Sequence, residues 1–185
     1  MIEDLREIGR TIILTSLIYI ILIFLTQNYI VKGNSMFPNL DDGHRVLVNK
    51  FVYFRVITLE NSKIGAGENF IFGGPQRDEI IVFNSPQPYQ KEALVKRIVG
   101  LPGDWVEIKN GIVLVNNKPT SKNFGFTSSI SFDEKMKVPE SMYFVLGDNR
   151  NYSNDSRIFG FISSDEIIGR VWITYWPFSE LKIFG

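Results

Sequence analysis

Residues 105–115 read Trp-Val-Glu-Ile-Lys-Asn-Gly-Ile-Val-Leu-Val, two short β-rich runs joined by an Asn-Gly pair. Asn110 and Gly111 tolerate the two positive φ angles of a type I′ turn, so this stretch predicts a tight antiparallel hairpin. Similar β-rich runs occur on both sides of it, at residues 45–51, 79–83, 93–99, 142–146 and 170–176. Turn residues separate these runs, which is typical of a mainly β, antiparallel domain.

Helical patterns are scarce in this part of the chain. Only residues 163–168 suggest a short helical turn. Residues 61–74 and 120–137 are polar or contain glycine, which predicts surface loops or peripheral extensions. We therefore expect residues 32–185 to form one β domain.

The N-terminal part of the chain has a different, more apolar composition. Residues 11–31 carry no charge, and 15 of them are Ile, Leu, Val, Phe or Tyr. As a helix this run would span about 31 Å, close to the hydrocarbon thickness of a bilayer. It exceeds the apolar part of a typical cleaved signal peptide, and no small-residue cleavage site follows it. The sequence predicts a tail at residues 1–10 and an uncleaved membrane anchor at residues 11–31, which the flanking charges do not orient.

Composition excludes several kinds of chemistry. The 185 residues include no Cys and one His, and 20 basic residues balance 20 acidic ones. The absence of Cys excludes thiolate nucleophiles, disulfides and cysteine zinc sites, and a single His excludes histidine-rich metal sites. A net charge of zero does not indicate the basic surface that nucleic-acid binding usually needs. We expect no metal, no cofactor and no nucleic-acid partner.

A serine directly follows the predicted anchor. Residues 33–40 read Gly-Asn-Ser-Met-Phe-Pro-Asn-Leu, and Ser35 is either a turn residue of a linker or a nucleophile at the membrane surface. A nucleophile needs a base. His44 stands nine residues further on, but it lies in an Asp-Gly-His-Arg turn that predicts a solvated side chain.

A lysine is the other known base for a serine nucleophile. In the run Ala-Leu-Val-Lys-Arg-Ile-Val of residues 93–99, Lys96 shares one strand face with Leu94 and Ile98. Such a lysine either extends its amine to water or holds a desolvated amine. A base requires desolvation, because at an ordinary pKa only about 0.1% of the amine is neutral at pH 7.4. The polar run of residues 147–157 is either a long loop or a network that positions such an amine.

In this order, residues 33–40, 77–83, 96–104 and 147–157 resemble four sequence boxes of the type I (leader) signal peptidases, which are membrane-anchored Ser–Lys enzymes. The resemblance covers most of the chain. It implies an antiparallel β-sheet catalytic domain like that of SOS-repressor peptidases, one N-terminal transmembrane helix and a small β subdomain at residues 105–146. It also implies that Ser35 is the nucleophile, that its backbone N–H binds the oxyanion, and that Lys96 is the general base.

The resemblance assigns supporting roles as well. Ser153 and Asp155 stand where the family places residues that orient and support the lysine, and Arg97 and Asp148 resemble structural members of the same boxes. Gly33 stands where one branch has a serine that assists the oxyanion, so that side-chain donor is absent here.

The implied substrates are secretory preproteins with small residues at positions −1 and −3. A lysine base points to the bacterial or organellar branch, and analogy places the catalytic domain outside the plasma membrane on a single-pass anchor. Met36, Phe37, Trp172 and Trp176 are candidates for contact with the lipid bilayer, although core packing competes for them.

Three alternatives stay open. The first is another Ser–Lys peptidase of the self-cleaving SOS-repressor type. The second is a membrane-tethered β scaffold without activity. The third keeps Ser35 as nucleophile and uses His44 as its base.

Overall fold

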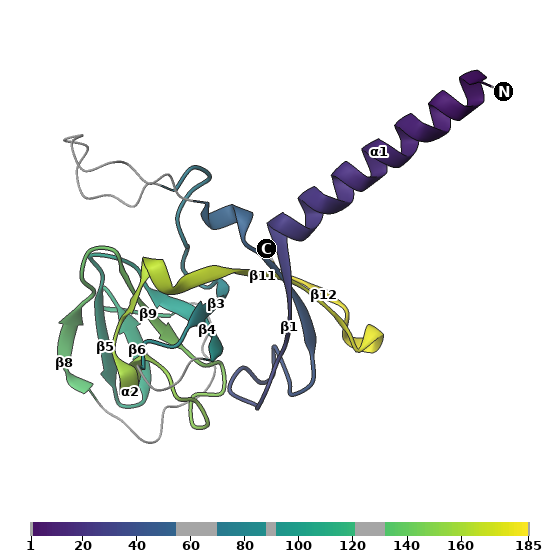
Figure 1. The fold of residues 1–185 in the computed structure, drawn as a ribbon. Helices are drawn as coiled ribbons and strands as arrows, with labels where there is room; N and C mark the ends of the chain where they lie inside the picture. Colours follow the sequence, from purple (N-terminus) through teal and green to yellow (C-terminus); the bar gives the residue numbers. More distant parts are fainter. Residues whose placement is uncertain (1, 55–69, 88–91, 121–131, 185) are drawn as a thin grey trace, which may run out of the picture.

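A long N-terminal helix leads into a curled β domain (Figure 1). The computed structural model describes residues 2–54, 70–87, 92–120 and 132–184. Helix α1 (Ile2–Leu25) projects from the domain and continues directly into β1 (Thr26–Ile30), which pairs antiparallel with β2 (Arg45–Asn49). The loop between β1 and β2 carries Ser35, so the anchor and the candidate nucleophile belong to one hairpin.

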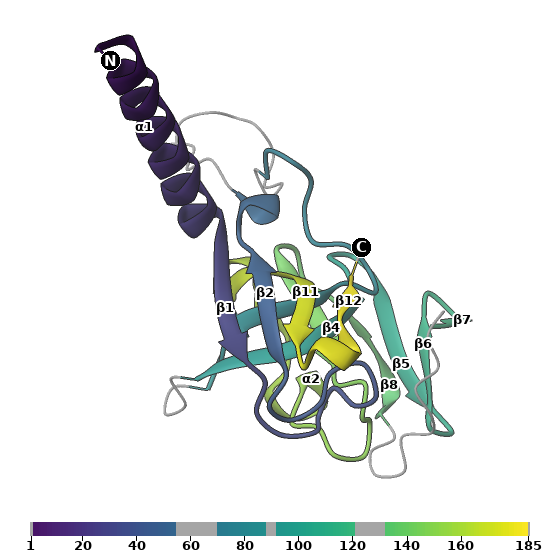
Figure 2. The same cartoon turned by 90° about the vertical axis from the view of Figure 1, so that its right-hand side faces the viewer.

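The larger sheet has the order β1-β2-β11-β3-β4-β9-β10, with β12 paired to β11, and all its paired strands are antiparallel. These pairings confirm the expected mainly β, antiparallel class. Strands β1, β2 and β11 lie side by side in Figure 2. The remaining strands are β3 (Ile80–Asn84), β4 (Ala93–Gly100), β9 (Met142–Leu146), β10 (Ile162–Ser163), β11 (Ile167–Trp176) and β12 (Lys182–Ile183).

A second sheet has the order β7-β6-β5-β8. It consists of β5 (Trp105–Lys109), β6 (Ile112–Val115), β7 (Lys118–Pro119) and β8 (Phe132–Lys137), so it uses residues 105–137, whereas β9 belongs to the larger sheet. The predicted hairpin is confirmed: Lys109 pairs with Ile112, and the turn residues Asn110 and Gly111 have φ angles of 51° and 76°.

Strand alternation divides the hydrophobic core. Ile80 and Val82 of β3 face a cluster with β2 and β11, while Ile81 and Phe83 face a second cluster with β4 and β9. A third cluster joins Phe144 and other residues of β4 and β9 to the second sheet. This is the period of two that an extended strand imposes on its side chains. Strand β3 is therefore buried on both faces and holds β4, which carries Lys96, in place.

The helix ends earlier than the sequence predicted. It includes residues 2–10, which were expected to be a separate tail, and it stops at Leu25 instead of residue 31. Residues 26–30 begin with Thr-Gln-Asn, and their backbone groups pair with β2 in place of the helix. The segment Arg6–Leu25 remains long and apolar enough to cross a membrane.

Several short elements escaped prediction. The 3-10 helices η1 (Phe51–Tyr53) and η3 (Phe178–Glu180) and helix α2 (Ser156–Phe159) each have at most four residues, too few to show a helical period. The turn expected near residues 163–168 is confirmed as η2 (Ser164–Glu166), which a capping box begins. The predicted loop at 120–137 contains β8 at 132–137, whereas 61–69 and 121–131 lie outside the described residues.

The prediction that Met36 contacts lipid is wrong. Its side chain is 0% exposed and packs among Val46, Val48 and other core residues. The physical reason is a turn in which Asn39 N–H and Leu40 N–H both donate to the Met36 carbonyl, because this turn directs Met36 into the domain. Buried Met36 thus fixes the segment that carries the neighbouring Ser35.

We expect Met36→Ala to lower the free energy of unfolding by about 2–5 kcal/mol, because it leaves a cavity in a packed core. Phe37→Ala is the matched control, since the Phe37 side chain is 51% exposed and its truncation leaves no such cavity. Chemical denaturation of the full chain in detergent, followed by tryptophan fluorescence, measures both. Equal losses for the two variants would contradict the burial of Met36.

Candidate active site

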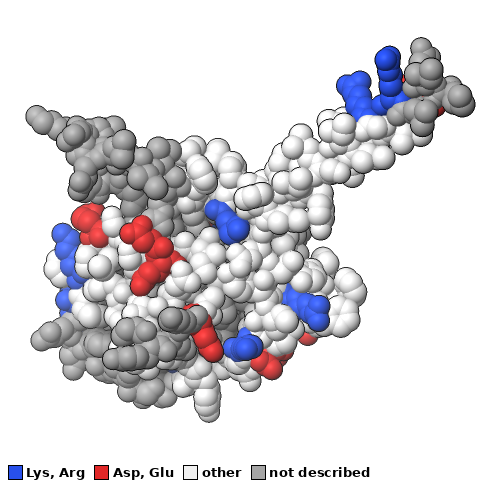
Figure 3. All heavy atoms as spheres, viewed as in Figure 1, with Lys and Arg blue, Asp and Glu red and all other residues white. Residues whose placement is uncertain are grey.

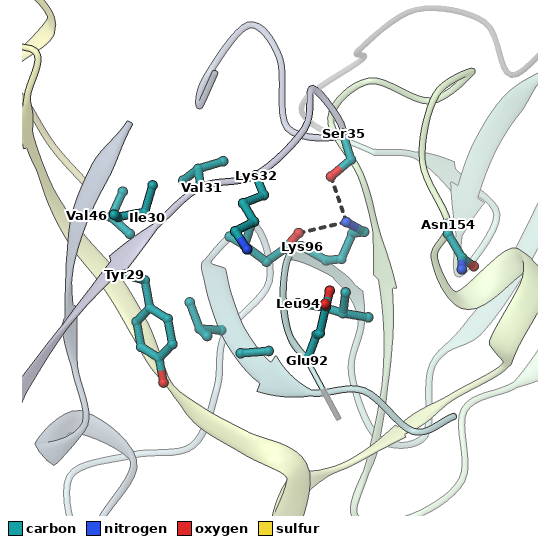
Figure 4. Close-up of a pocket in the computed structure, with 13 residues that line it drawn as sticks. Tyr29, Ile30, Val31, Lys32, Ser35, Val46, Glu92, Leu94, Lys96 and Asn154 are labelled. Atoms are coloured by element: carbon teal, nitrogen blue, oxygen red, sulfur yellow. Dashed lines mark hydrogen bonds between the residues drawn. The ribbon is translucent and has the colours of Figure 1, made fainter. Parts of the chain in front are cut away.

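The hydroxyl of Ser35 and the amine of Lys96 meet at one end of a cleft. Lys96 Nζ donates to Ser35 Oγ at 2.7 Å and to the Val95 carbonyl at 2.9 Å (Figure 4). Ser35 comes from the loop after β1 and Lys96 from the middle of β4, 61 residues apart in sequence. The tertiary fold thus brings a potential nucleophile into direct contact with a potential base.

Lys96 is a buried amine, as a lysine base requires. The residue is only 4% exposed, and its side chain lines the cleft beside Ser35. Burial lowers the pKa of Lys96 to about 8, while the carboxylates of Asp155 and Asp148 act in the opposite direction. A pKa of 8 leaves about a tenth of the amine neutral at pH 7, compared with less than 0.1% at the ordinary value.

The serine loop is held by its backbone. Asn149 N–H donates to the Ser35 carbonyl at 3.0 Å, and the Asn149 side chain donates to the Asn34 carbonyl at 3.1 Å. Gly147 lies directly beneath: an added Cβ there would stand 2.6 Å from the Ser35 carbonyl oxygen and 2.2 Å from Ser153 Oγ. A side chain at position 147 would therefore displace the segment that carries the hydroxyl.

Two buried ion pairs flank the lysine. Arg97 donates Nε–H and Nη2–H to the two carboxylate oxygens of Asp148, each at 2.7 Å. Asp155 pairs with Arg157 and accepts the Gly147 N–H at 3.0 Å. The two carboxylates act on the Lys96 amine and partly offset the effect of its desolvation on the Lys96 pKa.

The predicted supporting residues occupy different positions relative to the amine. Asp155 acts on Lys96 through its charge and holds Gly147 beneath the serine loop. Ser153 lies against Gly147, but its buried hydroxyl has no hydrogen-bond partner among the described residues. A direct hydrogen bond from Ser153 to the lysine is therefore not made in this structure.

The expectation that His44 is solvated is wrong. The residue is 5% exposed, its Nδ1 accepts the Asp41 N–H at 3.2 Å, and its Nε2 lies 3.1 Å from a Glu180 carboxylate oxygen. The C-terminal segment covers this histidine, an arrangement that the local sequence around residue 44 does not reveal. Both ring nitrogens thus face partners other than Ser35.

The cleft beside Ser35 lies between two open strand edges. Within the described chain, β1 pairs only with β2, and residues 93–96 of β4 pair only with β3. The cleft has a volume of about 430 Å³, and Figure 4 shows residues of both edges around it. Its lining comprises Tyr29, Ile30, Val31, Lys32, Ser35, Val46, Val82, Glu92, Ala93, Leu94, Val95, Lys96 and Asn154.

In the described part of the chain, the carboxylates and the histidine do not come together in the way that metal ligands do. Within the described residues, no cluster of three or more His, Asp or Glu side chains is placed to hold a metal ion.

We expect Lys96→Met to be more stable than the wild type at pH 7, by up to about 3 kcal/mol, the cost of lowering a pKa from 10.5 to about 8. Below pH 8 the lysine is protonated in both states and its burial disfavours the folded one. Above pH 10.5 the lysine is neutral in the folded and the unfolded state, so the difference in free energy of unfolding between the variant and the wild type should vanish. Denaturation at pH 7 and at pH 11 measures the change, with exposed Lys109→Met as control. A variant less stable than wild type at pH 7 would contradict this cost.

Comparisons with known proteins converge on one family. Residues 5–176 match the family model described as signal peptidase, peptidase S26. A signal peptidase I of Bacillus caldolyticus is 36% identical, over 85% of this chain and 84% of the relative. A signal peptidase IB of Staphylococcus aureus (strain COL) is 32% identical, over 96% of this chain and 94% of the relative.

Among solved structures, a signal peptidase I from Enterococcus faecalis V583 is 33% identical, with a TM-score of 0.43 over 54% of this chain and 97% of that one. The family match spans most of the chain and includes both Ser35 and Lys96. The chain therefore belongs to the signal peptidase family, peptidase S26.

Proposed function

We propose that this protein is a membrane-anchored serine endopeptidase that uses a Ser35–Lys96 dyad to cleave signal peptides from secreted preproteins. The observation that carries the proposal is the 2.7 Å contact between a buried lysine amine and a serine hydroxyl at the end of an open-edged cleft. Membership of the signal peptidase family and the names of the relatives support the same reaction.

In the proposed reaction, neutral Lys96 takes the proton from Ser35 Oγ as the oxygen attacks the scissile carbonyl. The C–N bond then breaks, and the lysine ammonium returns the proton to the leaving amine. Water hydrolyses the resulting acyl-enzyme by the same route. The Ser35 N–H, which makes no hydrogen bond to the described residues, is available to the oxyanion, a contribution of about 3 kcal/mol.

The cleft suits an extended peptide. A chain between the edges of β1 and β4 would add hydrogen bonds to both, which is strand addition. In an extended chain, positions −1 and −3 point to the same side. In the proposed complex these side chains face the apolar floor of the cleft, which includes Val46 and Val82. Because branched side chains form this floor, the space above it is shallow and suits small side chains. This supports the proposal that the substrates have small residues at −1 and −3.

The apolar helix α1 supports a membrane anchor. We place it as a single-pass anchor in a bacterial plasma membrane, with the catalytic domain on the outer face, because the family resemblance implies this arrangement. In Figure 3 the surface of α1 is free of charge over most of its length, and its charges lie near the N-terminus, where Arg6 and Arg10 stand beside Asp4 and Glu7. Phe37, Trp172 and Trp176 are 51%, 40% and 46% exposed and remain candidates for contact with lipid.

We expect Ser35→Ala and Lys96→Ala each to lower preprotein cleavage by at least about 1,000-fold, because each removes a group that takes part in bond making. His44→Ala should stay within about tenfold of wild type, because its ring contacts Asp41 and Glu180. The assay is cleavage of a preprotein by full-length protein in liposomes, with exposed Lys109→Ala as the matched lysine control.

The alternatives predict other outcomes in the same assay. If Lys96→Ala still cleaves the preprotein while His44→Ala does not, the base is His44 and not Lys96. A wild-type protein that cleaves no preprotein would favour the inactive scaffold. Cleavage of its own chain alone would favour the SOS-repressor type of reaction.

The pH dependence tests the role of the amine. Since Lys96 must be neutral to act as a base, kcat/KM should rise about tenfold per pH unit below the Lys96 pKa of about 8 and level off above it. The Asp155 carboxylate raises this pKa, so Asp155→Asn should move the midpoint to lower pH. Glu140→Gln, an exposed carboxylate elsewhere, should leave it unchanged. A midpoint that moves upward in Asp155→Asn would exclude Lys96 as the titrating base.

A further inference from the structure

The C-terminal segment of residues 177–184 folds back onto the loop that carries Ser35. It contains η3 and β12, and β12 pairs with Ile173 and Thr174 of β11. Phe184 N–H closes the segment by donating to the Trp172 carbonyl. The family match ends at residue 176, so the roles that the family model implies do not extend to these residues.

Two polar contacts join this segment to the serine loop, residues 31–44. Glu180 lies 3.1 Å from the buried Nε2 of His44, whose Nδ1 accepts the Asp41 N–H. Lys182 Nζ donates to Asn39 Oδ1 at 2.8 Å. Both contacts reach the side of the loop that follows Ser35.

Asn39 connects Lys182 to the buried ion pair next to the base. Its Nδ2 donates to Asp148 Oδ2 at 3.0 Å, the carboxylate oxygen that also accepts Arg97 Nη2–H at 2.7 Å. Arg97 directly follows Lys96 on β4. A continuous chain of hydrogen bonds therefore runs from Lys182 through Asn39 and Asp148 to the strand that holds the amine.

Three members of this chain of hydrogen bonds line a cavity. A polar cavity of about 210 Å³ is lined by Asn39, Arg97 and Lys182, and its other lining residues are 78–80, 170–171 and 183–184. Close packing cannot fix a side chain that borders open space, so hydrogen bonds must orient the amide of Asn39. Because a primary amide has both an acceptor and donors, it can bridge the ammonium and the carboxylate.

We infer that residues 177–184 are a clasp on the serine loop, and that Asn39 and Lys182 are positioning residues that align Ser35 with Lys96. The inference rests on the proposed peptidase reaction. The clasp acts through the loop and the Arg97–Asp148 pair and touches neither substrate nor the reacting atoms. Loss of the clasp should therefore lower kcat and leave KM unchanged, because the cleft edges of β1 and β4 stay intact.

The test compares Asn39→Ala, Lys182→Met and the double variant in full-length protein. Asn39→Ala removes a part-buried bond to a charged acceptor and should lower kcat about tenfold, whereas Lys182→Met removes an exposed bond and should lower it about threefold. The double variant should match Asn39→Ala alone, because both substitutions break one chain. Lys182→Arg, which keeps the positive charge and a donor, should have a kcat within about twofold of the wild-type value. Lys118→Met, at an exposed lysine, is the matched control.

Hydrogen exchange supplies a readout that does not need activity. In Asn39→Ala and Lys182→Met, amides of residues 33–43 should exchange faster than in wild type, while the hairpin of residues 105–115 should be unchanged. Unchanged exchange and kcat in Lys182→Met, or additive losses in the double variant, would overturn the clasp. If the wild type cleaves no preprotein but the loop exchange still rises, the proposed function fails and the clasp stands.

Discussion

Burial of the Lys96 amine against the Ser35 hydroxyl is the constraint around which the domain is organised. A lysine side chain is costly to desolvate, yet desolvation lowers its pKa to about 8 and increases the neutral fraction that can accept a proton. The paired carboxylates of Asp148 and Asp155 limit this cost without abolishing it. The folded state is therefore less stable than it would be with an apolar side chain at position 96, which is a common compromise at reactive sites.

Strand pairing explains how such an amine is held at a fixed place. Strand β4 pairs with β3 through residues 93–97 and with β9 from Arg97 onward, so its residues 93–96 leave one edge open. Lys96 thus stands directly before Arg97, the residue at which β4 gains β9 as its second neighbour. The open half provides an edge for an extended peptide, and the closed half provides the rigidity that positions the amine.

Four features hold the serine loop in place. Met36 and Leu40 anchor it in the core, Asn149 holds its backbone, Gly147 leaves space beneath it, and residues 177–184 contact its far side. Because the same loop follows β1, which continues helix α1, the nucleophile is connected to the anchor by a single strand. A short rigid connection of this kind keeps the reacting hydroxyl at a fixed distance from the end of the helix.

The sequence by itself determined the local features: the turn at Asn110 and Gly111, the strand runs, the apolar helix, and a lysine on an apolar strand face. Each depends on residues that are neighbours in the chain. Tertiary structure decided the rest, because it depends on residues far apart in sequence. Those decisions are the end of α1 at Leu25, the burial of Met36 and His44, and the contact between Ser35 and Lys96 across 61 positions.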